Sequence, residues 1–422
     1  MHSIKYIREN KETILDCINQ KKSDINLDEI LDIDLRRRTL IQEVENLKAD
    51  RNLINNKISN NKKNNEDCTN LINDMKNISI KIKALDNDLN QFKISLENKL
   101  KYIPNIIHDS VPIGKSANDN KVVKKWGVKP EFDFNPKSHL ELSESLNLID
   151  FKRAAKISGS AFPLYVDKGA KLERSLINYM LDTHIEKHKY IEVFPPFLVS
   201  GNSPYTTGNL PKFKDDMYHI ENDDLYCIPT AEVPITNFYA NEILSEKDLP
   251  KRFAAYSACF RREAGSYGKE TKGLQRLHQF NKVELVKFVH PNDSYDELEK
   301  LLNDAEIILQ ELNLHYRVIE LCGGDLSFSA AKCYDIEVWS PYENRYLEVS
   351  SCSNFESFQA KRGNIKFRNS NTNKTEFVHT LNGSGLATPR LMIAILESYQ
   401  NKQGKVVVPD LIRSYFGKDI VE

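Results

Sequence analysis

The chain has 422 residues and a formal net charge of −1 at pH 7. This length predicts two or three domains with room for a large enzyme core. The balanced charge excludes nucleic-acid binding through the overall charge of the protein, so any RNA contact must be local. The seven cysteines are scattered and include no Cys-x-x-Cys pair. We therefore expect neither a disulfide framework nor a zinc site, but reduced thiols in a cytoplasmic protein. The N-terminal stretch contains acidic residues and no long apolar run, and no segment is apolar enough to span a bilayer, so we expect no targeting signal and no membrane partner.

A long helical hairpin is expected near the N-terminus. Apolar residues recur there at alternating steps of four and three along two runs, which are separated by a polar stretch, 60–70, suited to a turn. The first run is Leu40, Val44, Leu47, Ile54 and Ile58, with Arg51 filling its gap, and the second is Leu71, Met75, Ile78, Ile82, Leu85, Leu89, Phe92 and Leu96. These heptad seams predict an antiparallel coiled coil whose second helix would reach roughly 50 Å. A dimerising zipper or a spacer has the same periodicity, whereas the lysines scattered along the arm favour an RNA contact.

The composition changes near residues 101–126, after which prolines, glycines and aromatics become frequent. Helical spacing then predicts a helix over 172–188, and a strand-like stretch, 189–198, is interrupted by a proline pair. Further strand-like segments lie at 225–228, 253–260, 276–288, 332–339 and 345–351. These segments predict an α+β domain in which an antiparallel sheet is flanked by helices, and no Walker or Rossmann glycine pattern contradicts this.

Two of these strand-like runs surround a polar loop and form the most informative segment. The first run leads into Arg261 and Glu263, and the second, 276–288, follows a loop rich in Gly, Lys and Thr. Since every second side chain of a strand shares a face, Arg261 lies with Glu263, and Phe280 lies with Glu284. An antiparallel pair would offer cations for phosphates, an aromatic face for a planar base, and a buried acid for an amine or hydroxyl. An ordinary charged surface hairpin is the alternative.

A second candidate segment, 379–400, lies near the C-terminus. It is expected to form a short strand, a Gly-Ser-Gly turn and a buried helix whose first turn holds Pro389 and Arg390. An arginine beside unpaired backbone N–H groups, at the positive end of a helix dipole, suits a terminal phosphate. Together with the hairpin, this helix start favours a nucleotide site.

These segments resemble the bacterial-type seryl-tRNA synthetases, which are class II aminoacyl-tRNA synthetases. Residues 260–288 look like the second class II motif, 379–400 like the third, and 192–199 like the first, which forms the dimer. Thr230-Ala231-Glu232 and 208–218 are similar to sequence specific to the seryl branch. The resemblance covers essentially the whole chain, and several long motifs in order are far more specific than one short pattern.

The resemblance implies an antiparallel-sheet class II catalytic domain at 111–422, preceded by a helical domain at 1–110 whose coiled-coil arm binds serine tRNA. The implied activity is that of a serine–tRNA ligase, which activates L-serine with ATP to seryl-adenylate and pyrophosphate and then transfers serine to the 3′ end of serine tRNA. Selenocysteine tRNA would be charged where one exists. ATP and Mg²⁺ without zinc are the implied cofactors, and a homodimer is the implied assembly.

The resemblance also implies roles for individual residues. Arg261 would bridge the α-phosphate and the serine carboxylate, and Arg390 would hold the γ-phosphate. These two are the expected catalytic residues, and Arg276 would help them. The expected serine-binding residues are Thr230, Ala231, Glu232, Glu284 and Ser384. The expected ATP-binding residues are Arg261, Arg262, Glu263, Phe280, Glu348, Val349, Ser350, Ser351 and Arg390, of which Glu348 and Ser351 would bind Mg²⁺.

Two other functions fit parts of the pattern. The first is that of a class II relative that activates another small amino acid or loads a carrier protein. The long arm speaks against it, because a carrier-loading relative would have no use for an RNA-reaching hairpin. A non-catalytic scaffold or RNA-binding paralogue would be expected to lose some of the set Arg261, Glu284, Glu348 and Arg390, which is intact.

Overall fold

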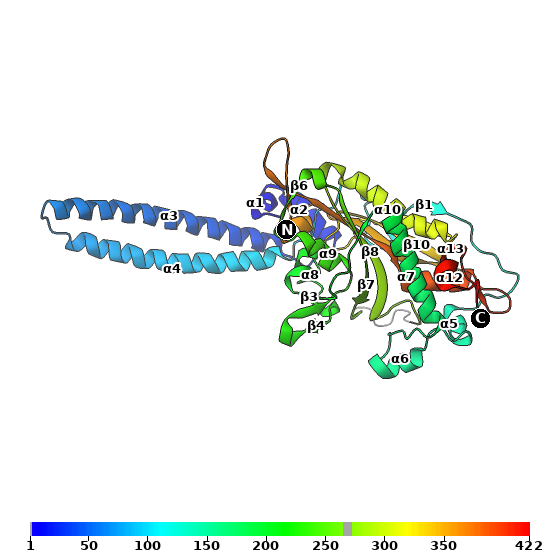
Figure 1. The fold of residues 1–422 in the computed structure, drawn as a ribbon. Helices are drawn as coiled ribbons and strands as arrows, with labels where there is room; N and C mark the ends of the chain where they lie inside the picture. The colour runs from blue at the N-terminus through cyan, green and yellow to red at the C-terminus, as the bar shows by residue number, and fades with distance from the viewer. Residues whose placement is uncertain (1, 265–271) are drawn as a thin grey trace. The chain divides into compact units, whose positions relative to one another are not determined.

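The computed structural model describes residues 2–264 and 272–422 and divides the chain into two compact units, Met1–Pro104 and Asn105–Glu422. The helices of the first unit are α1 Ile4–Glu9, α2 Lys11–Gln20, α3 Leu27–Lys63 and α4 Thr69–Leu100. α3 and α4 run antiparallel along their length, as Figure 1 shows. All the residues of the predicted seams are buried or half-buried, and ion pairs such as Lys81–Glu43 at 3.0 Å join the two helices. The predicted antiparallel coiled coil is confirmed.

The turn between these helices is shorter than the predicted 60–70. α3 continues to Lys63 because it ends in a hydrogen-bonded C-cap: Asn65 adopts a left-handed φ of 56° and the N–H of Glu66 donates to the carbonyl of Asn61 at 2.9 Å. Asparagine tolerates this conformation better than most residues. The helix therefore extends to Lys63, into the polar stretch whose composition predicted a turn from residue 60.

The second unit is built on an eight-stranded sheet of order β1-β9-β10-β11-β14-β8-β7-β2. Its neighbouring strands are antiparallel, except that β2 runs parallel to β7. The strands are β1 Lys121–Trp126, β2 Ile191–Glu192, β7 Lys251–Phe260, β8 Gln279–Val289, β9 Tyr316–Glu320, β10 Lys332–Ser340, β11 Arg345–Asn354 and β14 His379–Ala387. The predicted α+β fold with an antiparallel sheet is confirmed.

Helices and three small sheets surround this sheet (Figure 1). The helices are α5 His139–Ser145, α6 Phe151–Ser158, α7 Lys168–Glu186, α8 Asn202–Thr207, α9 Glu232–Thr236, α10 Ser294–Glu311, α11 Phe358–Gly363, α12 Thr388–Ser398 and α13 Asp410–Phe416. The small sheets contain β3 Leu198–Ser200, β4 His219–Ile220 and β5 Leu225–Cys227; β6 Ile243–Ser245, β12 Lys366–Arg368 and β13 Thr375–Phe377; and β15 Val406–Val407 and β16 Ile420–Val421.

Alternation along β8 separates the main core from the other face of the sheet. Val283 and Leu285 pack into a large apolar cluster with α7, α10 and α12. Val286 and Phe288 join a second cluster with residues of α9 and β12. Because Glu284 is two residues from Val286, it lies on the same side as this second cluster, away from the three long helices.

The C-terminal segment differs from its prediction. Residues 383–385, expected as a Gly-Ser-Gly turn, lie within strand β14, and the helix starts directly after it at Thr388. The glycines are needed for close packing: a Cβ on Gly383 would lie 2.8 Å from the sulfur of Cys352, and one on Gly385 would lie 2.5 Å from Nε2 of His184. Sequence alone does not distinguish a glycine in a turn from one under a packed side chain.

Candidate functional site

A cavity of 670 Å³ lies against β8, β11 and β14, at the start of α12, and brings most of the predicted site residues together. This volume is within the range of small-molecule sites. The predicted residues that line it are Thr230, Glu232, Arg261, Glu263, Arg276, Phe280, Glu284, Glu348, Val349, Ser351, Ser384 and Arg390. Residues 265–271 of the loop between β7 and β8 lie outside the described residues.

The acidic end of the cavity is centred on Thr230 and Glu284. The Thr230 hydroxyl donates to Glu284 Oε2 at 2.6 Å, and it accepts from Nζ of Lys282 at 3.0 Å and from the N–H of Glu232 at 3.1 Å. Lys282 and Glu284 also form an ion pair, and both side chains are nearly inaccessible to solvent. A buried carboxylate with a hydroxyl beside it can receive an ammonium group and hydrogen-bond a hydroxyl.

Glu232 is the second carboxylate at this end. Burial, followed by the charge of Glu284, raises its pKa from 4.5 to about 7. Nε2 of Gln359 donates to its Oε1 at 2.7 Å, and Oε1 of Gln359 accepts from Thr380 at 2.8 Å, so the carboxylate is held in one orientation. An incoming cation would favour its ionised form.

The same cavity also carries cations and an aromatic ring. The guanidinium of Arg261 lies 5.1 Å from the ring centroid of Phe280, and its Nε donates to the carbonyl of Pro229 at 3.4 Å. Arg276 donates to Glu263 Oε2 at 2.9 Å. β7 ends at Phe260, and Glu263 has a left-handed φ of 52°. The predicted strand alternation therefore does not extend to Arg261 and Glu263, although both line the cavity.

A β-bulge brings Glu348 and Ser351 to the same cavity. In a regular strand, residues three apart face opposite sides. In β11, however, Ser350 pairs with Ile336 and Glu348 with Glu337, which leaves Val349 as the extra residue of a bulge. The extra residue restores a common side for Glu348 and Ser351, and both line the cavity.

Arg390, in the first turn of α12, contacts this strand. One η nitrogen donates to the backbone carbonyl of Glu348 at 2.8 Å and lies 3.4 Å from its Oε2. Its Nε donates to the carbonyl of Gln275 at 3.4 Å. The guanidinium is thus held at the cavity wall by two backbone carbonyls.

Three predicted binding residues do not line the cavity. Ala231 is fully buried in the cluster around Phe253 and Phe288. Ser350 faces the other side of β11, where its hydroxyl donates to the carbonyl of Ser384 at 2.7 Å. Arg262 is exposed, with its N–H bonded to the carbonyl of Asp216 at 2.9 Å.

Two polar residues at the acidic end had no predicted role. Lys282 lines the cavity, and its position two residues before Glu284 placed it on the same strand face, which was the available signal. Gln359 contacts Glu232 from a distant part of the chain, and no local pattern indicates it. Within the described residues, no group of three or more His, Cys, Asp or Glu side chains is arranged to hold a metal ion, and no helix is long and apolar enough to cross a membrane.

Known proteins resemble the chain along its full length. Residues 212–399 match the model of the tRNA synthetase class II core domain (G, H, P, S and T), and residues 1–107 match that of the seryl-tRNA synthetase N-terminal domain. A serine–tRNA ligase of Chloroherpeton thalassium is 52% identical over 426 residues, and one of Caldicellulosiruptor saccharolyticus is 54% identical over 422 residues; each alignment covers 100% of both chains. The chain belongs to the seryl-tRNA synthetase family.

Solved structures of the seryl-tRNA synthetase family agree with this assignment. The seryl-tRNA synthetase from Pyrococcus horikoshii complexed with ATP superposes with a TM-score of 0.94 at 38% identity, covering 100% of this chain and 99% of that one. The cytoplasmic serine–tRNA ligase from Naegleria fowleri in complex with AMP superposes with a TM-score of 0.88 at 26% identity, covering 98% and 96%. The resemblance inferred from the motifs is therefore confirmed for both units of the chain.

Proposed function

We propose that the chain is a serine–tRNA ligase that forms seryl-adenylate in this cavity. The observation that carries the proposal is the presence of opposite charges in one cavity, whose lining includes the buried pair Thr230–Glu284 together with Arg261 and Arg390. A small amino acid with a hydroxyl fits beside the Thr230–Glu284 pair, and a nucleotide fits beside the cations and the Phe280 ring.

In the proposed reaction, the serine ammonium group contacts Glu232 and Glu284, and its carboxylate points toward Arg261. One carboxylate oxygen attacks the α-phosphorus of ATP, and the bond to the bridging oxygen breaks so that pyrophosphate leaves. Arg261 and Arg390 stabilise the charge on the phosphate oxygens, and no side chain acts as a nucleophile. A ribose hydroxyl of the tRNA end then attacks the seryl carbonyl carbon and AMP leaves.

Glu348 and Ser351 fit a magnesium site by the chemistry of their donors. A carboxylate and a hydroxyl are hard oxygen ligands, and Mg²⁺ is usually held by one or two protein groups together with substrate phosphates. Bound Mg²⁺ would neutralise charge on the phosphates of ATP. Glu348 also lies 3.4 Å from Arg390, so both would contact the same end of the triphosphate.

Selection among small amino acids follows from the acidic end. A site that hydrogen-bonds the serine hydroxyl rejects alanine strongly, because Glu284 and Thr230 would lose a polar partner in a buried place. Threonine differs by one methyl group, which steric exclusion discriminates by about 1–3 kcal/mol. Threonine is therefore the harder competitor.

The arm and the assembly complete the proposal. Residues 1–110 would bind serine tRNA through the α3–α4 coiled coil, and residues 111–422 would carry catalysis and dimerisation, in the cytoplasm. Ile191 in the edge strand β2 and Phe194 just beyond it are 59% and 73% exposed, which supports a homodimer through this edge. Selenocysteine tRNA would also be a substrate where one exists.

ATP–pyrophosphate exchange with each small amino acid tests this function. We expect exchange that depends on serine, weak exchange with threonine and none with alanine, followed by charging of serine tRNA by the same enzyme. Preferred exchange with another amino acid, or none with serine, would refute the proposal.

A further inference from the structure

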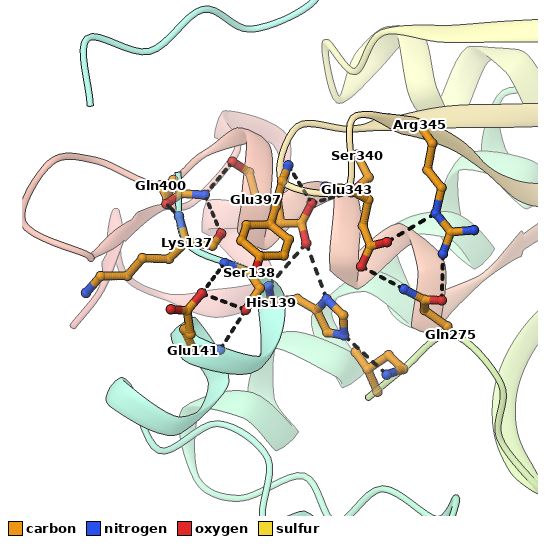
Figure 2. A network of polar contacts seen from close by, with 12 residues as sticks. Lys137, Ser138, His139, Glu141, Gln275, Ser340, Glu343, Arg345, Glu397 and Gln400 are labelled. Atoms are coloured by element: carbon orange, nitrogen blue, oxygen red, sulfur yellow. Dashed lines mark hydrogen bonds and ion pairs between the residues drawn. The ribbon is translucent and has the colours of Figure 1, made fainter. Parts of the chain in front are cut away.

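Glu397 is a fully buried carboxylate in α12, the helix that carries Arg390 in its first turn. Its Oε1 accepts a hydrogen bond from the N–H of His139 at 3.1 Å and faces Nδ1 of the same residue at 3.3 Å. Its Oε2 accepts from the hydroxyl of Ser340 and from the N–H of Tyr342, the latter at 3.3 Å. Figure 2 shows this carboxylate at the centre of the network. It holds the start of α5 and the turn between β10 and β11 at the same time.

His139 extends this contact to the segment that enters β8. The N–H of Leu274 donates to Nε2 of His139 at 3.4 Å, and the imidazole is 1% exposed. Because Nε2 accepts an N–H, Nδ1 is the nitrogen that can donate to the Glu397 carboxylate. The chain passes so close that a Cβ on Gly273 would lie 2.3 Å from Nε2.

The β10–β11 turn holds the next residue of the same segment. Gln275 donates from Nε2 to Glu343 Oε1 at 2.9 Å and accepts at Oε1 from Arg345 at 2.8 Å. Glu343 is tied back to Ser340, whose hydroxyl accepts its N–H at 3.3 Å. Both supports of the Leu274–Gln275 segment, the imidazole and the turn, therefore depend on Glu397 (Figure 2).

The contacts close into a ring at Arg390. The backbone carbonyl of Gln275 accepts from Nε of Arg390 at 3.4 Å. These contacts form a closed ring of hydrogen bonds. It runs from Glu397 through His139 and the Leu274–Gln275 segment to Arg390, which lies seven residues before Glu397 on the same helix. A guanidinium has five N–H donors, more than these wall contacts use, so orienting it by carbonyls leaves donors for a phosphate.

We propose that Glu397 and His139 are positioning residues for Arg390 and through it for ATP. The inference rests on the proposed function, in which Arg390 holds the γ-phosphate. Neither residue lines the cavity, so each would act through the Leu274–Gln275 segment. Loss of the ring should raise the KM for ATP and leave the KM for serine unchanged, because Thr230 and Glu284 contact none of these residues. A purely structural role would lower the active fraction without separating the two KM values.

The test compares four variants by steady-state pyrophosphate exchange, corrected for the active fraction by adenylate titration. His139→Leu and Glu397→Gln should each raise the KM for ATP about tenfold, with the KM for serine within about twofold. His139→Gln should recover most of this loss, because an amide oxygen can accept the N–H of Leu274. The matched control is Glu141→Ala, which removes the capping box of α5 with Ser138 but none of the ring contacts, and should leave both KM values unchanged.

Two results in His139→Leu and Glu397→Gln would overturn the inference. One is an equal change in the KM for ATP and the KM for serine, and the other is a KM for ATP within about twofold of that of the unaltered enzyme. If those variants do not fold, Gln275→Ala decides, because it removes the clamp to Glu343 and Arg345 from a half-buried position. A rise of about threefold in the ATP KM is expected there, and no rise would contradict the inference. If the unaltered enzyme shows serine-dependent pyrophosphate exchange and the variants leave its KM for ATP unchanged, only this inference is refuted. If the unaltered enzyme shows no serine-dependent exchange, the proposed function is refuted.

Discussion

The hydroxyl of Thr230 donates a 2.6 Å hydrogen bond to Oε2 of Glu284, 54 residues further along the chain. The same carboxylate oxygen is paired with Lys282. This contact joins the segment before α9 to the centre of β8 and holds the Glu284 carboxylate in one orientation in the cavity lining. This pair defines the proposed serine-binding part of the site.

Replacing Glu284 by Gln should affect serine far more than ATP. The change removes a buried negative charge and leaves Lys282 without its carboxylate, so we expect the KM for serine to rise by about tenfold to a hundredfold and the KM for ATP by less than about twofold. The measurement is pyrophosphate exchange with each substrate varied in turn. Glu337→Gln, on β10 and outside the cavity lining, is the control. Equal losses for both substrates would show that Glu284 is assigned wrongly.

Serine binding should depend on pH through Glu232, whose pKa burial and the charge of Glu284 raise to about 7. The neutral carboxyl dominates below this pH and the carboxylate above it, and only the carboxylate pairs with the serine ammonium group. The KM for serine should therefore fall as pH rises from 6 to 8. In Glu232→Gln this dependence should disappear, while the ATP KM keeps its profile. A serine KM that does not vary over this range in the unaltered enzyme would contradict the assignment.

The bulge in β11 predicts different effects for two neighbouring serines. Ser351 shares a side with Glu348, whereas Ser350 faces away and bonds to Ser384. Ser351→Ala should raise the Mg²⁺ concentration for half-maximal exchange several-fold, and Ser350→Ala should leave that concentration unchanged. The measurement is a magnesium titration at saturating ATP and serine. The reverse result would place the metal on the other side of the strand.

Glu173 should make stability depend on pH. Burial raises its pKa from 4.5 to about 7, and its Oε1 accepts from Nδ2 of Asn281 at 2.8 Å. Since the folded-state pKa lies above the unfolded value, the stabilising contribution is complete below pH 4.5 and is lost as pH rises through 7. Glu173→Gln cannot ionise, so its stability relative to the unaltered protein should increase between pH 5 and pH 8, by about 3 kcal/mol at most. Thermal unfolding at both pH values measures this, and a constant difference would contradict it.

Shortening the arm should separate the two steps of the reaction. Removing residues 50–56 and 72–78 deletes one heptad from each of α3 and α4 and keeps the seam and the turn. Adenylate formation should be unchanged, because the cavity lies within 105–422, while the KM for serine tRNA should rise. Exchange and charging assays on the same preparation distinguish the outcomes. If both activities fall together, the arm supports folding and is not a separate tRNA-binding element.

Local patterns were sufficient for much of this structure. The heptad seam from Leu71 to Leu96 predicted the arm, because apolar side chains at coiled-coil spacing require a partner helix. The strand alternation of β8 placed Phe280 and Glu284 on one face, and both line the cavity. The proline and arginine before an apolar run marked the start of α12.

Features that depend on distant segments were not predictable. Gly383 and Gly385 lie in a strand, where Cys352 and His184 leave no room for a Cβ. Nothing in the spacing of Glu348 and Ser351 indicates the bulge that brings them together. His139 and Glu397 are 258 residues apart, and neither lies in a pattern that suggests the other. Such contacts require the tertiary structure.

The most direct test of the account is a crystal structure with a non-hydrolysable seryl-adenylate analogue. We expect its ammonium group within hydrogen-bonding distance of Thr230, Glu232 and Glu284, its adenine on the Phe280 ring, and its phosphate-mimicking group against Arg261. An analogue whose seryl end lies away from the Thr230–Glu284 pair, or whose adenine does not contact Phe280, would contradict the central claim that this one cavity joins serine to ATP.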